Sequence, residues 1–327
     1  MPRLLRRLLW FAEWVLAAPM LLTAPLLTAH AAEAAARLFG RAAFALLAGD
    51  RAWALGNLRL AFGDTLSEPA RRRLAAAVFE HHARMFLEIL RMTAADVERR
   101  LVIEGLEHVP ALSATGRGVI AVSGHLGNFE ILAGVFSRRG MPCTMLARPL
   151  DNPFFEATLR SHRARYGNRT LPRTPAGLRE ALRRLARGEA LGIAVDQNAR
   201  VGGVFVDFLG VPAATAPGAA QLVLRYGCPA ALLVTHRLPD GRHRVVLGPP
   251  IAPVRTGDAD ADVAATLRAF TAALEPYVLA WPGQYHWQHP RWRTRPDGSH
   301  LRTAADLERL AAEPTARTGT TPDGKTR

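Results

Sequence analysis

Residues 119–130 constrain the fold of this chain more than any other stretch of its sequence. An apolar, β-branched run (119–122) stops at Ser123-Gly124, a histidine and a small flexible pair follow, and residues 129–136 have the composition of a helix. This order predicts a buried strand, a tight turn and a helix start. The turn after such a strand is where α/β folds bind their ligands.

Two residues of this stretch can carry chemistry together. His125 lies in the predicted turn, and Glu130 lies in the first helical turn, from where its carboxylate can reach back to the imidazole. A carboxylate beside an imidazole fixes its tautomer and makes the neutral ring a better base. Such a pair can deprotonate a hydroxyl group for attack on an acyl group. The spacing alone fits equally well a histidine and a glutamate that only cap the strand and the helix.

The segment from His125 to Glu130 resembles the H-x4-D/E motif of the glycerolipid and lysophospholipid acyltransferase superfamily. Within it, the chain resembles the bacterial lipid A late acyltransferases of the lauroyl/myristoyl type, which add a secondary acyl chain to the lipopolysaccharide anchor. Three further blocks carry this resemblance: residues 51–62 (R-x-x-x-x-x-N-L-x-x-x-F), residues 148–153 (the Y-R-P-x-x-N-P block) and residues 281–296 (P-x-Q-Y-x-W-x-H-x-R-W).

The resemblance implies transfer of a fatty acyl chain from an acyl thioester, acyl-acyl-carrier protein or alternatively acyl-CoA, to a hydroxyl of a lipid A precursor. It implies that His125 is the general base and that Glu130 orients it. The attack is direct and needs no cofactor or covalent enzyme intermediate. We expect the backbone N–H groups of Gly124, Gly127 and Asn128, with Arg163, to stabilise the oxyanion.

Five polar residues are predicted to bind substrate. Arg148 and Asn152 lie in the block that follows another predicted strand, and the Arg163–Gly167 segment matches the position of a functional arginine in the family. Asp196 and Gln197 follow the strand predicted at 191–195 and resemble the family's D-Q block. Alternatively, Arg163 belongs to a solvated basic helix face and Asp196 only caps its loop.

The N-terminus is predicted to attach the protein to a membrane. Arginines precede an apolar run from Leu8 to Ala29, which is close to the ~20 residues that span a bilayer. A cleaved signal peptide is the rival interpretation, disfavoured because Glu13 and a second apolar helix (34–47) do not fit it. The helix either crosses the membrane, stops short of crossing or pairs with the second helix as a hairpin. We expect the inner membrane, with the catalytic domain facing the cytoplasm.

The predicted fold class is α/β: a single acyltransferase domain with a mostly parallel central sheet flanked by helices, plus an N-terminal membrane-anchoring helix. The predicted boundaries are 1–48 for the membrane-associated helical segment, 49–302 for the acyltransferase domain and 303–327 for a disordered tail.

Two later segments have open interpretations. Residues 202–213 suit either the wall of an acyl-chain site or core packing. In residues 281–296, tryptophan and tyrosine alternate with arginine, which suits a membrane interface or a glycolipid headgroup. His286 and His289 form an H-x-x-H pair, but no further ligands cluster near them in the sequence, so we expect no metal site.

The net charge of the chain limits the kinds of binding partner that we expect. Its formal net charge is +14, and Lys325 is the only lysine, so arginine carries nearly all of the positive charge. A basic surface suits anionic membrane lipid, a phosphorylated glycolipid acceptor or an acidic acyl-carrier protein. We expect no nucleic-acid partner, because no motif or aromatic platform is arranged for one.

Three other functions remain open on the sequence. The same chemistry could serve another acceptor, such as a phosphatidylinositol mannoside or a lysophospholipid. A non-catalytic membrane-binding relative would keep the fold without the reaction. A thioesterase would use water as the acceptor, although Ser123 lies outside any G-x-S-x-G elbow and does not indicate a serine hydrolase.

Overall fold

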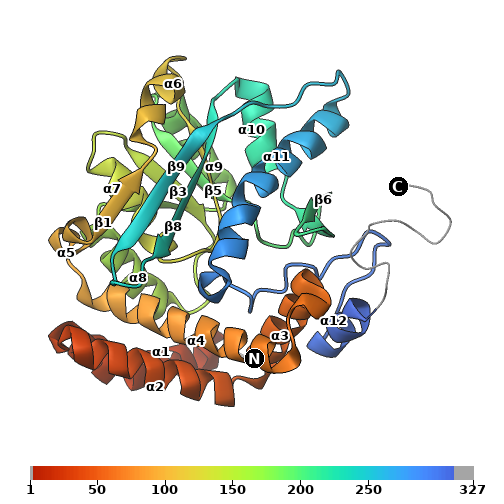
Figure 1. Cartoon of the computed structure of the whole chain (residues 1–327). Helices are drawn as coiled ribbons and strands as arrows, with labels where there is room; N and C mark the ends of the chain where they lie inside the picture. Colours follow the sequence, from red (N-terminus) through yellow and green to blue (C-terminus); the bar gives the residue numbers. More distant parts are fainter. Residues whose placement is uncertain (1–2, 313–327) are drawn as a thin grey trace.

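The computed structural model describes residues 3–312 and contains a seven-stranded sheet in the order β1-β9-β8-β2-β5-β3-β4 (Figure 1). Every neighbouring pair is parallel except β8 and β9, which are antiparallel. The predicted mostly parallel sheet is therefore confirmed. Its strands are β1 (Leu101–Glu104), β2 (Ile120–Ser123), β3 (Cys143–Ala147), β4 (Arg169–Pro172), β5 (Ala190–Ala194), β8 (Ala230–Arg237) and β9 (His243–Ile251).

Helices cover both faces of this sheet because its central strand is apolar on both sides. All four residues of β2 are buried. Ala121 packs into the cluster that contains α7 (Leu132–Ser137), whereas Ile120 and Val122 pack into the cluster on the opposite face. That second cluster receives residues from α9 (Pro175–Ala186), α10 (Gly218–Tyr226) and α11 (Ala259–Ala280).

The N-terminal segment forms a helical hairpin that packs on the catalytic domain. α1 (Arg3–Thr23) and α2 (Ala29–Leu46) are joined by a short 3-10 turn, and α2 runs along α4 (Glu68–Arg91). α1 contacts α8 (Pro153–Arg165), where the Trp14 indole N–H donates to Thr158 Oγ1 at 3.0 Å. The structure thus shows two helices joined by a turn, each of which packs mainly on the rest of the domain, and how the first helix meets the membrane stays a prediction.

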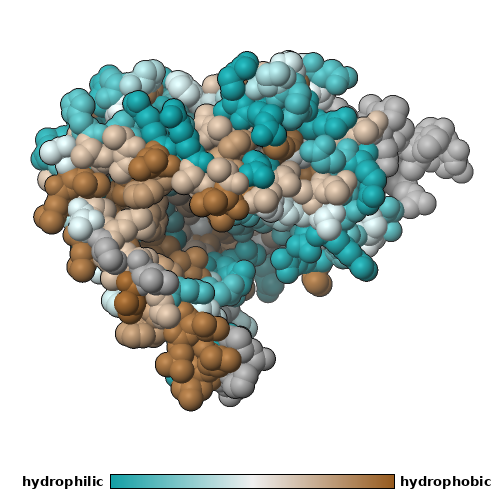
Figure 2. Space-filling model, turned by 90° about the horizontal axis from the view of Figure 1, so that it is seen from below, coloured by the Kyte–Doolittle hydropathy of each residue, from teal (hydrophilic) through white to brown (hydrophobic). Residues whose placement is uncertain are grey.

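The outer side of the hairpin is strongly apolar. Leu22, Leu26, Leu38 and Leu46 are each more than 60% exposed, and Figure 2 shows apolar side chains gathered on the face that carries these helices. Residues 4–26 are also long and apolar enough to cross a membrane. This exposed surface is consistent with membrane attachment through the N-terminal segment.

The predicted disordered tail is wrong for its first residues. α12 (Ala304–Ala311) begins at a capping box, in which the Thr303 side chain and the Asp306 carboxylate each accept the other's backbone N–H. Leu307 is fully buried against Gly56 of α3 (Ala48–Phe62), which gives the helix an apolar contact that pattern alone did not reveal. The remainder of the predicted tail, 313–327, lies outside the described residues.

The aromatic C-terminal block is core, and its predicted role at a membrane interface is wrong. Trp287, Arg291 and Trp292 are each at most 2% exposed. They pack on the hairpin of β6 (Val204–Phe208) and β7 (Val211–Thr215), so of the two interpretations of residues 202–213 the structure supports core packing. Burial is possible for Arg291 because its guanidinium donates to Gln197 O, Ala214 O and Thr215 Oγ1.

Asn57 of α3 fastens this C-terminal block to the domain. Its side-chain amide donates to the carbonyl oxygens of Trp287 (2.7 Å) and His289 (2.8 Å). We predict that Asn57→Ala lowers the free energy of unfolding by about 2–4 kcal/mol, because the buried carbonyl of Trp287 and the half-buried carbonyl of His289 lose their donor. Urea unfolding followed by tryptophan fluorescence measures this change.

The matched control is Arg59→Ala on the same helix, whose half-exposed ion pair with Glu308 is worth at most about 1 kcal/mol. An Asn57→Ala loss no larger than that of Arg59→Ala would contradict the fastening role.

Candidate active site

The parallel pairing of β2 and β5 brings two distant segments to one edge of the sheet. Ser123 at the end of β2 is in register with Ala194 at the end of β5, so the residues that follow each strand emerge side by side. His125 and Asp196 meet there. The His125 Nδ1 lies 2.8 Å from Asp196 Oδ1, and the His125 backbone N–H donates to Asp196 Oδ2 at 2.6 Å.

The charges of this pair support one another. Asp196 is only 3% exposed, and burial opposes its ionisation, but the His125 ring and backbone N–H outweigh burial and lower the pKa of Asp196. Burial likewise opposes protonation of His125, yet Asp196 and, more weakly, Glu130 outweigh it and raise the pKa of the imidazole. Because the Asp196 carboxylate accepts a hydrogen bond from Nδ1–H, the lone pair of the neutral ring is on Nε2.

The predicted contact between Glu130 and His125 is absent from the described residues. Glu130 lies in a 3-10 turn (Phe129–Ile131) before α7, and its carboxylate accepts two hydrogen bonds from Arg163, at 2.6 and 2.7 Å. Burial lowers the pKa of Arg163, but Glu130 outweighs it and the pKa is raised. Glu130 therefore positions Arg163, whereas the position beside His125 Nδ1 belongs to Asp196.

A cavity of about 950 Å³ opens from this pair. Its polar end holds His125, Glu130, Arg163 and Gln197. Beyond them it extends along α10, where both Gly218 and Tyr226 line it, which corresponds to about 12 Å of helix. Its volume is at the upper end of the range for ligand sites. Its apolar walls come from Met145, Leu146, Leu159, Leu178, Leu182, Ile193 and Leu222.

The other predicted substrate-binding residues divide into two groups. Gln197 lies beside the second ring nitrogen of His125, with its side-chain amide 3.3 Å from Nε2. Arg148 lines the cavity, is largely exposed and pairs with Asp151. Asn152 instead caps α8, and its amide donates to Trp10 O at 3.0 Å and Glu13 Oε2 at 3.1 Å. The structure therefore gives Asn152 a role in holding α1.

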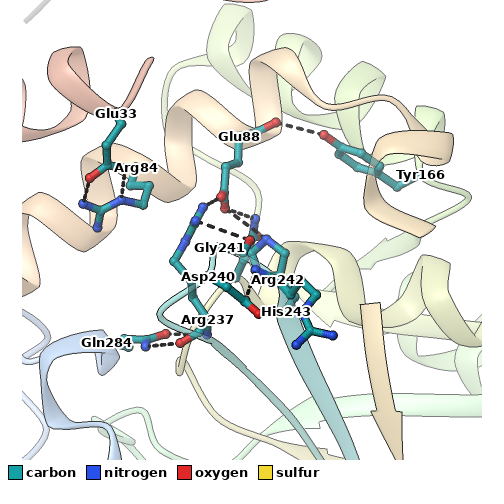
Figure 3. Close-up of polar contacts among 11 residues, drawn as sticks. Glu33, Arg84, Glu88, Tyr166, Arg237, Asp240, Gly241, Arg242, His243 and Gln284 are labelled. Carbon is teal, nitrogen blue, oxygen red and sulfur yellow. Dashed lines mark hydrogen bonds and ion pairs between the residues drawn. The ribbon is translucent and has the colours of Figure 1, made fainter. Parts of the chain in front are cut away.

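The turn after β2 is tightly packed. A side chain at Gly124 would bring Cβ within 2.5 Å of Leu274, and Gly127 has a φ of +60°. The Gly127 N–H donates to Gln284 O at 3.0 Å, so it is not free for an oxyanion. The Asn128 side chain donates to Glu88 Oε2 at 3.0 Å, at the edge of the buried network that Figure 3 shows around Glu88.

The C-terminal block supplies site residues that sequence reasoning missed. The His286 N–H donates to His125 O at 3.1 Å, and the His286 ring lines the cavity with its centroid 5.9 Å from that of His125. Burial, aided by the neighbouring histidines, lowers the pKa of His286 well below its usual value, so the ring is neutral. Burial and Asp196 raise the pKa of Tyr285. The H-x-x-H spacing suggested only a metal pair, which we did not expect, and gave no sign that His286 lies beside His125.

A histidine with a free Nε2 at the polar end of a long apolar cavity suits transfer of an acyl chain to a hydroxyl group, as expected of an α/β acyltransferase. More specifically, it belongs to the bacterial lipid A biosynthesis acyltransferase family, whose family model matches residues 2–294.

Two relatives illustrate the range of this similarity. The chain is 29% identical over 249 residues to the lipid A biosynthesis lauroyltransferase of Escherichia coli (strain K12), covering 74% of this chain and 78% of the relative. It is 28% identical over 230 residues to a phosphatidylinositol mannoside acyltransferase of Mycobacterium tuberculosis, covering 67% of this chain and 70% of the relative. Both names describe acyl transfer to a glycolipid, and acyl transfer is the activity class of this chain.

The hydrogen bonds at His125 predict which carboxylate controls its pKa. Asp196→Asn removes the charge bonded to Nδ1, so burial dominates and the pKa of His125 falls. Glu130→Gln lowers the same pKa by a smaller amount, because Glu130 acts only through charge at longer range. Titration of the His125 ring proton by NMR in the two variants measures both shifts. A larger fall in Glu130→Gln would restore Glu130 as the main partner.

Proposed function

We propose that this enzyme transfers a fatty acyl chain from acyl-acyl-carrier protein to a hydroxyl group of a lipid A precursor. The observation that carries the proposal is the His125–Asp196 pair at the polar end of the apolar cavity. The similarity to a lipid A lauroyltransferase supports the acceptor. The net charge of +14 supports an acidic carrier as the donor and anionic lipid at the membrane.

His125 is the proposed general base. Its Nε2 takes the proton of the acceptor hydroxyl as the oxygen attacks the thioester carbonyl carbon. The tetrahedral intermediate then collapses, the carbon–sulfur bond breaks, and the same proton passes from Nε2 to the leaving thiolate. The products are an ester and the free thiol of the carrier, so protons balance without a cofactor. Asp196 acts as a positioning residue, because it holds the tautomer and supports the imidazolium.

Arg163 and the turn after β2 are the proposed oxyanion stabilisers. The ion pair with Glu130 holds the Arg163 guanidinium at the cavity wall, near the reacting carbonyl. Backbone N–H groups at Gly124 and Asn128 are further candidate donors. Gln197 and Arg148 line the same end of the cavity and are proposed to contact the polar parts of the substrates.

The acyl chain is proposed to occupy the apolar part of the cavity along α10. We propose that the catalytic domain faces the cytoplasm at the inner membrane, where a soluble acyl-carrier protein can deliver the chain. The exposed apolar surface of the N-terminal hairpin supports attachment there.

A phosphatidylinositol mannoside is the second candidate acceptor, favoured by the similarity to mycobacterial acyltransferases of that name. It uses the same donor, base and acyl site, and differs only in the glycolipid that reaches Nε2. An acceptor comparison with one enzyme preparation therefore separates the two.

The proposal predicts that membranes containing the wild-type enzyme acylate a tetra-acylated lipid A precursor with acyl-acyl-carrier protein. His125→Ala reduces this rate by about 10²–10⁴-fold, because the general base is lost. The matched control is His300→Ala, an exposed histidine outside the cavity, which keeps the wild-type rate. Mass spectrometry of the product lipid measures the transfer.

Wild-type activity on the mannoside alone would overturn the lipid A acceptor but leave the chemistry standing. Full activity of His125→Ala would overturn the general base.

The cavity along α10 predicts a steric effect on chain length. Leu222→Trp fills its middle, so kcat/KM for long acyl chains falls by about tenfold or more relative to short chains. Leu224→Trp adds the same bulk to the same helix outside the cavity and keeps the wild-type preference. Competition between donors of two chain lengths measures the ratio, and an unchanged ratio in Leu222→Trp would place the acyl chain elsewhere.

A further inference from the structure

A second, smaller cavity lies between the N-terminal hairpin and the catalytic domain, and it shares no lining residue with the catalytic cavity. Its volume is about 50 Å³, which is room for a few waters or a small tetrahedral oxyanion. α2 and α4 provide most of its wall. The lining residues are Ala29, Ala32, Glu33, Arg84, Leu87, Glu88, Arg91, Arg100 and Arg237.

The cavity has more arginines than glutamates, so two of its four arginines have no glutamate of the wall as a partner. Arg84 holds Glu33 through two hydrogen bonds, at 2.7 and 2.6 Å. Arg237 pairs with Glu88, and Figure 3 shows both pairs. Each glutamate is thus neutralised by its own arginine, and the surplus positive charge resides on the remaining cations of the wall.

Those remaining cations are Arg91 and Arg100. The Nε and Nη2 of Arg91 both donate to Leu27 O, at 3.1 and 2.7 Å, which anchors the turn before α2. Within residues 3–312, no carboxylate lies in ion-pair contact with either guanidinium, and the nearby Asp96 caps α5 (Ala94–Arg99) and pairs with Arg99. Arg100 helps to lower the pKa of Asp96, but the ion pair of this carboxylate is with Arg99, so contacts with carboxylates leave part of the positive charge of the cavity uncompensated.

The start of α2 adds to the same positive potential. Ala29, the first residue of this 18-residue helix, lines the cavity, so the positive end of the helix dipole is at its wall. The cations also crowd one another: burial and the neighbouring Arg84 lower the pKa of Arg237 to about 10. An anion in the cavity relieves this repulsion.

The location identifies the kind of anion. The turn that Arg91 holds carries Leu26, which is 81% exposed, and it follows Leu22 at the end of α1, which is 73% exposed; both belong to the apolar surface of the hairpin. The cavity opens only a few residues further along the chain, at Ala29. When the apolar turn is in lipid, a site at this position is at the depth of the phosphate groups.

We propose that this arginine cavity binds the phosphoryl group of an anionic lipid headgroup at the membrane surface. Guanidinium groups suit phosphate oxygens because their donors form a rigid fork. The site is separate from the proposed acyl transfer, and its test measures binding alone.

The test uses the full-length protein in neutral detergent with three probes: dihexanoyl phosphatidic acid, dihexanoyl phosphatidylcholine and inorganic phosphate. Thermal unfolding at increasing probe concentration gives an apparent Kd for each. We expect stabilisation by the phosphatidic acid, a weaker effect of inorganic phosphate, and none of phosphatidylcholine, whose headgroup carries its own cation.

The main variant is Arg100→Gln. Within the described residues the Arg100 side chain makes no hydrogen bond, so this substitution removes the charge without breaking a structural contact of that kind. We expect its apparent Kd for phosphatidic acid to rise by about tenfold. Arg91→Gln is an independent second variant with the same expected direction. The matched control is Arg72→Gln, an exposed arginine on the same helix as Arg91 and about 28 Å away along it, which keeps the wild-type Kd.

Each outcome decides the proposal. An equal loss of affinity in Arg72→Gln would show diffuse charge attraction and overturn the site. Stabilisation by inorganic phosphate that equals that of phosphatidic acid, and that is lost in Arg100→Gln, would uphold a phosphoryl site but overturn the lipid headgroup as its source. If phosphatidylcholine bound with the same affinity as phosphatidic acid, both the phosphoryl site and its preference for an anionic lipid headgroup would be overturned.

Discussion

The parallel pairing of β2 with β5 is the constraint on which the active site depends. Because both strands run in the same direction and end in register, the turn that holds His125 and the loop that holds Asp196 leave the sheet together. Side chains alternate between the faces of a strand, so a slip of one residue would separate the imidazole from the carboxylate. The apolar residues that bury β2 on both faces thus also fix the geometry of the His125–Asp196 pair.

Local sequence patterns predicted the strand, turn and helix of this site, but not which of its charged side chains contact one another. The apolar run before Ser123 and the polar residues after it predicted a strand end with a histidine, and the structure agrees. The carboxylate that bonds His125 is 71 residues away, so only the order of strands in the sheet could identify it. Glu130 is the nearer carboxylate in the sequence, but it accepts hydrogen bonds from Arg163, which is 33 residues away.

Composition was least informative where burial decides the role of a residue. Tryptophan beside arginine describes a membrane interface and a hydrogen-bonded core equally well. Only the acceptors that surround Arg291 show that the C-terminal block is core. Similarly, the polar sequence after residue 302 concealed a single apolar side chain, Leu307, that docks α12 on α3.

The contacts between α1 and α8 have a mechanical consequence. α8 is a rod about 20 Å long that touches the N-terminal hairpin through Asn152, Phe154 and Thr158, and that carries Arg163 at its other end. α8 therefore connects the N-terminal helix directly to the cavity wall at Arg163, without a flexible linker between them. With α1 in lipid, as proposed, its tilt would set the angle at which the cavity meets the bilayer and the direction from which an acceptor approaches.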